Sequence, residues 1–322
     1  MSESRSAIHL SPNQRAWRRF RRNRGAMVSI VILIGLVSII LIWPIFSRPA
    51  VARFLPRGLT AEPDAITDAQ FAPPDAQHWF GTDVHGRDLL SRVCYGARIS
   101  LLVGLVGAVV SLVIGVLWGA VAGYTGGRLD GFMMRFVDVL YSLPSIIFVI
   151  VLITTLNAFL AQLQTGKNGF SPDTVKTLRF VGLFAGLGAV SWLTMARIVR
   201  GQVLSLRNRA FVDASRVLGA SHARILLRHI LPNVYGVIIV YLTLTIPSIV
   251  LYESFLSYLG FGIQPPEASL GSLIASGAEQ INAIRIYWWL IVFPATALAA
   301  TLLALNFVGD GLRDAWDPRS EK

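Results

Sequence analysis

Six long runs of apolar residues alternate with polar stretches along this chain. Each run holds about 20 residues, which is the length that an α-helix needs to cross the hydrocarbon core of a membrane. The runs are Met27–Phe46, Ser100–Gly123, Phe132–Leu156, Leu178–Met195, Val234–Phe255 and Tyr287–Phe307. Because a helix satisfies its own backbone hydrogen bonds in lipid, the pattern predicts an all-α membrane protein with six transmembrane helices.

The polar stretches divide the rest of the chain. They predict a basic segment at 1–26, a first helix at 27–46, an external loop at 47–96, a block of five helices at 97–310 with a polar loop at about 200–232, and a tail at 311–322. At the end of the external loop, the sequence is typical of a capped helix that enters the membrane. There Asp88 and Arg92 are four residues apart and can pair across one turn.

The basic N-terminal segment has two open interpretations. Trp17 and Phe20 share one face of a predicted helix among six arginines. Such a helix can lie on anionic lipid headgroups, or the segment can be a solvated tail that only fixes the orientation of the first span.

Composition agrees with the membrane class. Hydrophobic residues make up 54% of the chain and charged residues 15%, which is too apolar for an ordinary soluble domain. The formal net charge of +11 comes from arginines in blocks beside apolar runs, which favours membrane orientation over nucleic-acid binding. The single Cys94 excludes an internal disulfide and any cysteine-based metal site.

The arginines also predict the orientation. Six spans leave both termini on the same side of the membrane. Arginines crowd the connection between the fourth and fifth spans, opposed only by Asp213, whereas the loops at 47–99, 157–177 and 256–286 have mixed charge. Since cytoplasmic loops carry an excess of Lys and Arg, we expect this loop and both termini to be cytoplasmic.

Small residues mark one face of the second span. They recur every four residues, at Gly107, Ser111, Gly115, Gly119 and Gly123. A smooth stripe of this kind lets a neighbouring helix backbone approach closely, so we interpret it as a packing surface rather than a pore lining. Gly182 and Gly186 repeat the pattern in the fourth span.

The arginine-rich loop contains a predicted helical hairpin. Phe211, Val212, Ala214, Val217 and Leu218 give a short helix an apolar side. Gly219 can adopt the left-handed conformation that ends this helix, and a second basic helix follows up to Pro232, which is tolerated at the start of the next span. Such a hairpin is suited to docking on a soluble partner.

Three charged residues fall within or beside the spans, where charges usually mark function. Arg135 and Asp138 are three residues apart, and we interpret them as a structural ion pair. For Glu253, near the outer end of the fifth span, two interpretations stay open: a gate or pathway residue that contacts substrate, or simple placement at the interface. The charged residues after the last span, Asp310, Arg313, Asp314 and Asp317, are typical of a solvated tail.

The sequence lacks the patterns of an enzyme. It has no GxxxxGK[ST] phosphate-binding loop, no HExxH or GxSxG motif, and no cluster of cysteines and histidines. We therefore expect no catalytic, cofactor or metal site on this chain.

The hairpin resembles the cytoplasmic coupling loop of permease subunits in binding-protein-dependent ABC importers. That loop carries an EAA triplet, a glycine after three further residues and then a Leu-Pro pair, which correspond here to Asp213-Ala214-Ser215, Gly219 and Leu231-Pro232. Asp replaces Glu, Ser replaces the second Ala, and His229 takes a position often filled by Ile.

From Ala16 to Arg319 the chain resembles the smaller-loop permease subunit of the dipeptide, oligopeptide and nickel importers. The resemblance rests on Phe80–Leu101, Met134–Ser145, Leu256–Pro266 and Val308–Arg319 as well as the basic start and the hairpin. It implies a type I importer fold, a bacterial inner-membrane location, a second permease subunit, an external substrate-binding protein and two ATPase subunits that bind ATP and Mg²⁺. It also implies an ATPase-coupling role for Val212, Asp213, Ala214, Ser215, Leu218, Gly219 and Ala220.

The resulting hypothesis is a permease subunit of an ATP-driven importer that translocates peptides or peptide-like solutes. Import of nickel or another small solute is the alternative within this class. A secondary transporter is the alternative from another class, but it calls for coupling-ion acids near mid-membrane and for inverted repeats, and neither is clear in the sequence.

Overall fold

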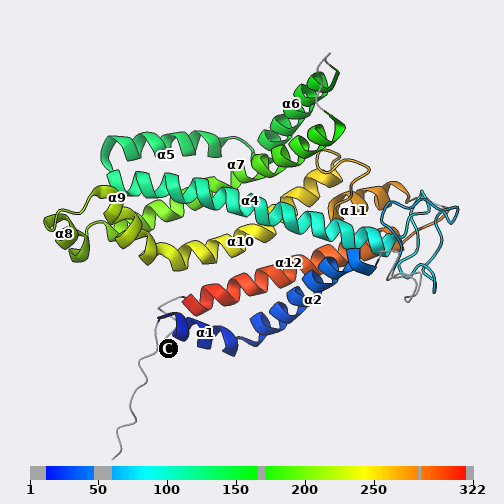
Figure 1. The fold of residues 1–322 in the computed structure, drawn as a ribbon, viewed down its shortest axis with the longest axis horizontal. Helices are drawn as coiled ribbons and strands as arrows, with labels where there is room; N and C mark the ends of the chain where they lie inside the picture. Colours follow the sequence, from blue (N-terminus) through cyan, green and yellow to red (C-terminus); the bar gives the residue numbers. More distant parts are fainter. Residues whose placement is uncertain (1–11, 47–59, 166–170, 282–283, 317–322) are drawn as a thin grey trace, which may run out of the picture.

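The computed structural model describes residues 12–46, 60–165, 171–281 and 284–316 as an elongated bundle of helices (Figure 1). In these ranges the only β-type pairing is an isolated bridge between Thr82 and Asp88. The helices are α1 (Pro12–Arg22), α2 (Arg24–Phe46), α4 (Leu89–Thr125), α5 (Gly127–Ser142), α6 (Ser145–Thr165), α7 (Pro172–Leu206), α8 (Ala210–Val217), α9 (His222–Ile225), the π-helix η2 (Leu226–Ile230), α10 (Leu231–Tyr258), α11 (Leu270–Glu279) and α12 (Trp289–Trp316).

Six of the helical stretches in the described ranges are long and apolar enough to cross a membrane, which confirms the predicted number. They are α2, α4, α6, the main part of α7, the continuous stretch from α9 through η2 to α10, and α12. The short helices α8 and α9 lie at one end of the bundle, and α11 lies at the other with residues 60–88, the described loop before α4 (Figure 1). We call these the hairpin end and the loop end.

The third predicted span, Phe132–Leu156, is wrong as a single helix. The chain breaks at Pro144, because Leu143 takes an extended conformation (φ −83°, ψ 136°) as residues before proline commonly do. The membrane-length helix is therefore α6, while α5 starts at the hairpin end and runs back beside α4 (Figure 1).

The glycine stripe of α4 packs against α7. A Cβ atom on Gly115 would lie 2.6 Å from the Cβ of Met195, and one on Gly123 would lie 2.7 Å from the carbonyl oxygen of Arg200. At Gly119 the same atom would overlap the carbonyl of Ala196. The interpretation as a packing surface is confirmed, since only residues without a side chain permit this approach.

The first and last helices of the described residues, α1 and α12, pack together. Phe20 of α1 is buried against Ala26 and Ala315, whereas Trp17 is 57% exposed and stacks on Phe20 at a centroid distance of 5.9 Å. The helix α12 continues to Trp316, so the first part of the predicted tail at 311–322 is helical. Asp310, Arg313 and Asp314 are exposed on its last turns, and Asp317 lies outside the described residues.

The loop before α4 is tied to the start of that helix. Asp88 is the N-cap and accepts a hydrogen bond from the backbone N of Ser91 at 2.9 Å, which confirms the capped helix. The predicted pair of Asp88 with Arg92 is wrong. The carboxylate of Asp88 is occupied by Ser91 and by His78 (3.0 Å), and Arg92 pairs instead with Asp64 at 3.1 Å.

Candidate functional site

The hairpin, residues 210–230, is anchored to the bundle by its apolar side chains. Val212 of α8, Ile225 of α9 and Ile230 of η2 are fully buried and pack in one cluster with the ends of α4, α7 and α10. The hydroxyl of Tyr124 on α4 also contacts Nδ1 of His222 at 2.9 Å. The hairpin is therefore a packed part of the fold rather than a free loop.

Gly219 ends α8 as the sequence predicted. Its φ is +76°, in the left-handed region that favours glycine. The backbone N of Gly219 donates to the carbonyl of Arg216 at 2.9 Å, and that of Ala220 donates to the carbonyl of Ser215 at 3.0 Å. This pair of bonds is a Schellman motif, after which Ser221 caps α9 through its side chain.

The tip of the hairpin exposes two large apolar side chains. Val217 is 87% exposed and Leu218 is 86% exposed, and a Cβ atom on Gly219 would meet no other atom within 4 Å. The apolar side predicted for α8 is thus divided, because Val212 points into the bundle while Val217 and Leu218 point away from it. Exposed apolar residues among charges are typical of a protein-binding surface.

The remaining coupling-loop positions surround this tip. Asp213 and Ala214 are exposed, and Asp213 accepts from Arg216 at 3.0 Å. Ser215 donates its hydroxyl to the carbonyl of Phe211 at 2.8 Å, one turn back along α8. These side-chain interactions stay within α8. Asp213 and Ala214 therefore remain exposed beside the apolar tip formed by Val217 and Leu218.

The predicted pair of Arg135 and Asp138 is wrong. Asp138 of α5 pairs with Arg197 of α7 at 2.7 Å, while Arg135 is exposed. A second pair, between Asp130 of α5 and Arg200 of α7, joins the same two helices. Both carboxylates pair with α7, which lies beside α5 near the hairpin end. The two helices are far apart in the sequence, so local spacing does not predict these pairs.

Glu253 of α10 is completely buried near the loop end. Its carboxylate accepts hydrogen bonds from the hydroxyls of Ser257 on α10 (2.6 Å) and Ser100 on α4 (2.9 Å). Ser100 in turn accepts from the backbone N of Leu270, the first residue of α11, at 3.3 Å. Glu253 therefore links three helices inside the bundle, and both interpretations, a gate or pathway residue and interfacial placement, stay predictions.

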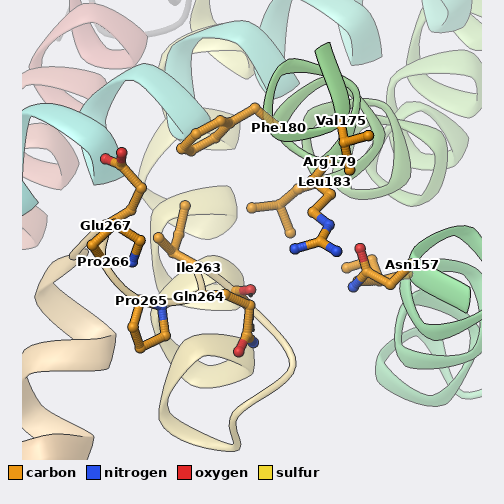
Figure 2. Close-up of a pocket in the computed structure, with 12 residues that line it drawn as sticks. Asn157, Val175, Arg179, Phe180, Leu183, Ile263, Gln264, Pro265, Pro266 and Glu267 are labelled. Carbon is orange, nitrogen blue, oxygen red and sulfur yellow. Dashed lines mark hydrogen bonds between the residues drawn. The ribbon is translucent and has the colours of Figure 1, made fainter. Parts of the chain in front are cut away.

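A pocket of about 290 Å³ opens at the loop end between α6, α7 and the segment after α10 (Figure 2). The pocket was not predicted from the sequence. Its polar groups come from Arg179 of α7, Asn157 of α6, Gln264 and Glu267, and Phe180 and Leu183 supply apolar ones. In the described part of the chain, no group of three or more His, Cys, Asp or Glu side chains is placed to hold a metal ion.

Comparison with known sequences identifies the class of protein. The family described as the inner membrane component of binding-protein-dependent transport systems matches residues 115–322, and the N-terminal transmembrane domain of oligopeptide transport permease C matches residues 11–74. The chain belongs to this family of inner-membrane transport components.

Individual relatives are similar over nearly the whole chain. The oligopeptide transport system permease protein OppC of Haemophilus influenzae is 44% identical over 95% of this chain and 88% of its own length. The dipeptide transport system permease protein DppC of Bacillus subtilis is 42% identical over 96% of this chain and 87% of its own length.

Solved structures support the fold. The MetNI methionine ABC transporter in an inward-facing conformation matches 70% of this chain and 97% of its own with a TM-score of 0.52 at 20% identity. The predicted type I importer permease fold is confirmed.

Proposed function

We propose that this chain is the membrane-spanning subunit of an ATP-driven importer that moves dipeptides, oligopeptides or related solutes across the bacterial inner membrane. The similarity to oligopeptide and dipeptide permeases over almost the full length supports peptides as the solute class. In this proposal ATP and Mg²⁺ are bound and ATP is hydrolysed by two partner ATPase subunits, and this chain contributes no catalytic residue.

The observation that carries the proposal is the exposed apolar tip of the hairpin. Val217 and Leu218 protrude beside the rigid turn at Gly219, while the base of the hairpin is fixed to the bundle through Val212. An exposed apolar surface is more stable when it is buried in the cleft of a partner protein than when it contacts water. The packed base of the hairpin holds this surface in place for such a contact. The cleft of an ATPase subunit is the occupant we propose.

The remaining partners and the topology follow from the same scheme. The hairpin end and both termini face the cytoplasm, in accordance with the arginines of the hairpin and of α1. A second, homologous permease subunit completes the pathway, and a substrate-binding protein delivers the solute at the loop end.

Coupling requires that the ATPases favour different conformations of the permease in their different nucleotide states. Moving a two-state equilibrium from 1:99 to 99:1 takes a difference of about 5.5 kcal/mol in binding free energy. The hairpin joins α10 through η2 without an intervening loop, so a displacement of the tip is passed directly to a membrane helix.

The proposal is tested by placing a charge on the tip. We expect Leu218→Asp to abolish co-purification of the ATPase subunits, or to abolish the stimulation of ATP hydrolysis by substrate-loaded binding protein. Ser205→Asp, at an exposed position of α7 near the hairpin end, serves as the matched control and is expected to preserve both. A well-expressed Leu218→Asp complex with normal assembly, hydrolysis and uptake would rule out the tip as the coupling surface.

A further inference from the structure

The pocket at the loop end has the chemistry of a binding site. It is enclosed by helices α6 and α7 on one side and by residues 262–267 on the other (Figure 2). Its volume of about 290 Å³ lies at the lower end of the range for small-molecule sites, about 300–1,000 Å³. That size suits one terminal residue of a peptide and is too small for a whole oligopeptide.

Arg179 places a positive charge in this pocket. Figure 2 shows its guanidinium extending from α7 into the space between Asn157 and the segment that carries Gln264. Among the residues that the structure describes, no carboxylate pairs with Arg179. The one carboxylate of the pocket lining, Glu267, accepts a hydrogen bond from Tyr95.

Arg179 lies near the start of the membrane-length stretch of α7 and is exposed, so its guanidinium is accessible to a ligand. The guanidinium offers several N–H donors in a planar arrangement that matches the two oxygens of a carboxylate. Phe180 and Leu183 supply an apolar wall of the same pocket.

Two amide side chains complete the polar lining. The Nε2 atom of Gln264 donates to the carbonyl of Gly260 at 2.8 Å, which leaves the side-chain oxygen to accept a hydrogen bond from a ligand. Asn157 lies across the pocket near the guanidinium and can donate or accept (Figure 2). Donors and acceptors of this kind pair with the peptide group that precedes a terminal carboxylate.

We infer that this pocket binds the carboxylate-bearing end of the transported peptide, with Arg179 pairing with the carboxylate and the apolar wall receiving the terminal side chain. The inference rests on the proposed function and deepens it by naming the chemical group that the permease itself recognises. A carboxylate can come from the C-terminus or from an acidic side chain, and the pocket alone fits both.

The test measures peptide uptake by the complete complex of both permease subunits, the ATPases and the binding protein, reconstituted in proteoliposomes. Three peptides are compared: trialanine, trialanine amide, and Ala-Asp-Ala amide. We expect Arg179→Gln to reduce uptake of trialanine about tenfold or more, as expected for loss of a charge-assisted hydrogen bond. Arg179→Lys, which keeps the charge, is expected to retain more of the uptake than Arg179→Gln does.

The amidated peptides identify the source of the carboxylate. If the C-terminus is the ligand, Arg179→Gln changes the uptake of both amides by less than about twofold, whereas a loss confined to Ala-Asp-Ala amide assigns the site to acidic side chains. Arg98→Gln is the control, because Arg98 is an exposed arginine near the same end of the bundle and does not line the pocket.

Two results would overturn the inference. The first is uptake of trialanine and of Ala-Asp-Ala amide by Arg179→Gln that both equal those of the wild type. The second is an equal loss of trialanine uptake in Arg179→Gln and Arg179→Lys, accompanied by failure of both variants to assemble with the partner permease. That result would make the pocket a subunit contact. A wild-type complex that takes up no peptide would instead remove the proposed function, and this inference with it.

Discussion

Arg200 of α7 contacts both carboxylate oxygens of Asp130 on α5, with distances of 2.5 Å from Nε to Oδ1 and 2.7 Å from Nη2 to Oδ2. Such a two-point pair fixes the orientation of both side chains. It holds α5 against α7 close to the hairpin, on the far side of the break at Pro144. The neighbouring pair of Asp138 and Arg197 makes a single contact and is more exposed.

The two pairs should differ in their effect on stability. Asp130→Ala leaves a partly buried guanidinium without its partner, so we expect a loss of about 2 kcal/mol, between the values for buried and surface pairs. Asp138→Ala, in the more exposed pair, should cost less than about 1 kcal/mol. Thermal unfolding of the two variants in detergent checks this order, and equal shifts would contradict it.

Gly219→Val should uncouple transport from ATP hydrolysis. The residue has a φ of +76°, which a β-branched side chain strongly disfavours, so the turn at the hairpin tip must change. Uptake and substrate-stimulated hydrolysis should be measured on the same assembled complex, and we expect uptake to be lost. Gly127→Val is a close control, because Gly127 also has a positive φ (+60°) and open space around its Cβ position. Loss of uptake by both variants would point to general damage to turns.

The α4–α7 contact should not tolerate a methyl group. We expect Gly119→Ala to destabilise the chain by about 1–3 kcal/mol, because the new Cβ atom overlaps the carbonyl of Ala196 and the backbones must separate. Gly201→Ala on α7 meets open space and should be neutral or stabilising, by up to about 1 kcal/mol, from its higher helix propensity. The melting temperatures of the two variants decide between packing and a general intolerance of glycine replacement.

Glu253→Ala should loosen the junction of α4, α10 and α11. It removes the acceptor for Ser100 and Ser257 in a fully buried place, so we expect a loss of about 2 kcal/mol or more. Glu253→Gln retains an acceptor oxygen and should lose less. If the Glu253→Gln variant folds normally and yet takes up no peptide, a direct role of the carboxylate in gating is supported. Normal uptake by this variant would leave Glu253 a structural residue.

The orientation can be tested with single cysteines in a Cys94→Ala background. Ser221 on the hairpin and Ala76 in the loop before α4 are both exposed. With an impermeant thiol reagent on intact cells, we expect labelling at position 76 and none at position 221. The reverse pattern would invert the proposed topology.

Features that depend on local sequence were predicted well. The apolar runs have the length that a membrane requires, the glycine at position 219 is the residue that a left-handed helix end selects, and the four-residue spacing of small residues in α4 is a packing pattern in itself. The break at Pro144 was missed because apolar residues continue on both sides of it. The hydrophobic pattern alone therefore did not indicate that one helix ends there and another begins.

Features that depend on distant residues could not be predicted in this way. Asp138 and Arg197 are 59 positions apart, and Glu253 and Ser100 are 153 apart. Local spacing pointed instead to Arg135 as a partner, because only neighbours on the same helix are visible in one sequence. The pocket around Arg179 requires the fold itself, since it joins three segments that share no motif.

The continuity of α10 has a mechanical consequence. Its 28 residues make a rod about 42 Å long, joined at one end to the hairpin through η2 and followed at the other by the segment that carries Gln264. Pro247 lies within this rod, where the missing backbone N–H removes one rung of the hydrogen-bond ladder and makes bending easier. Under the proposed function, a displacement of the hairpin would reach the loop end through α10, and the ease of bending at Pro247 would set how much of it arrives as translation and how much as tilt.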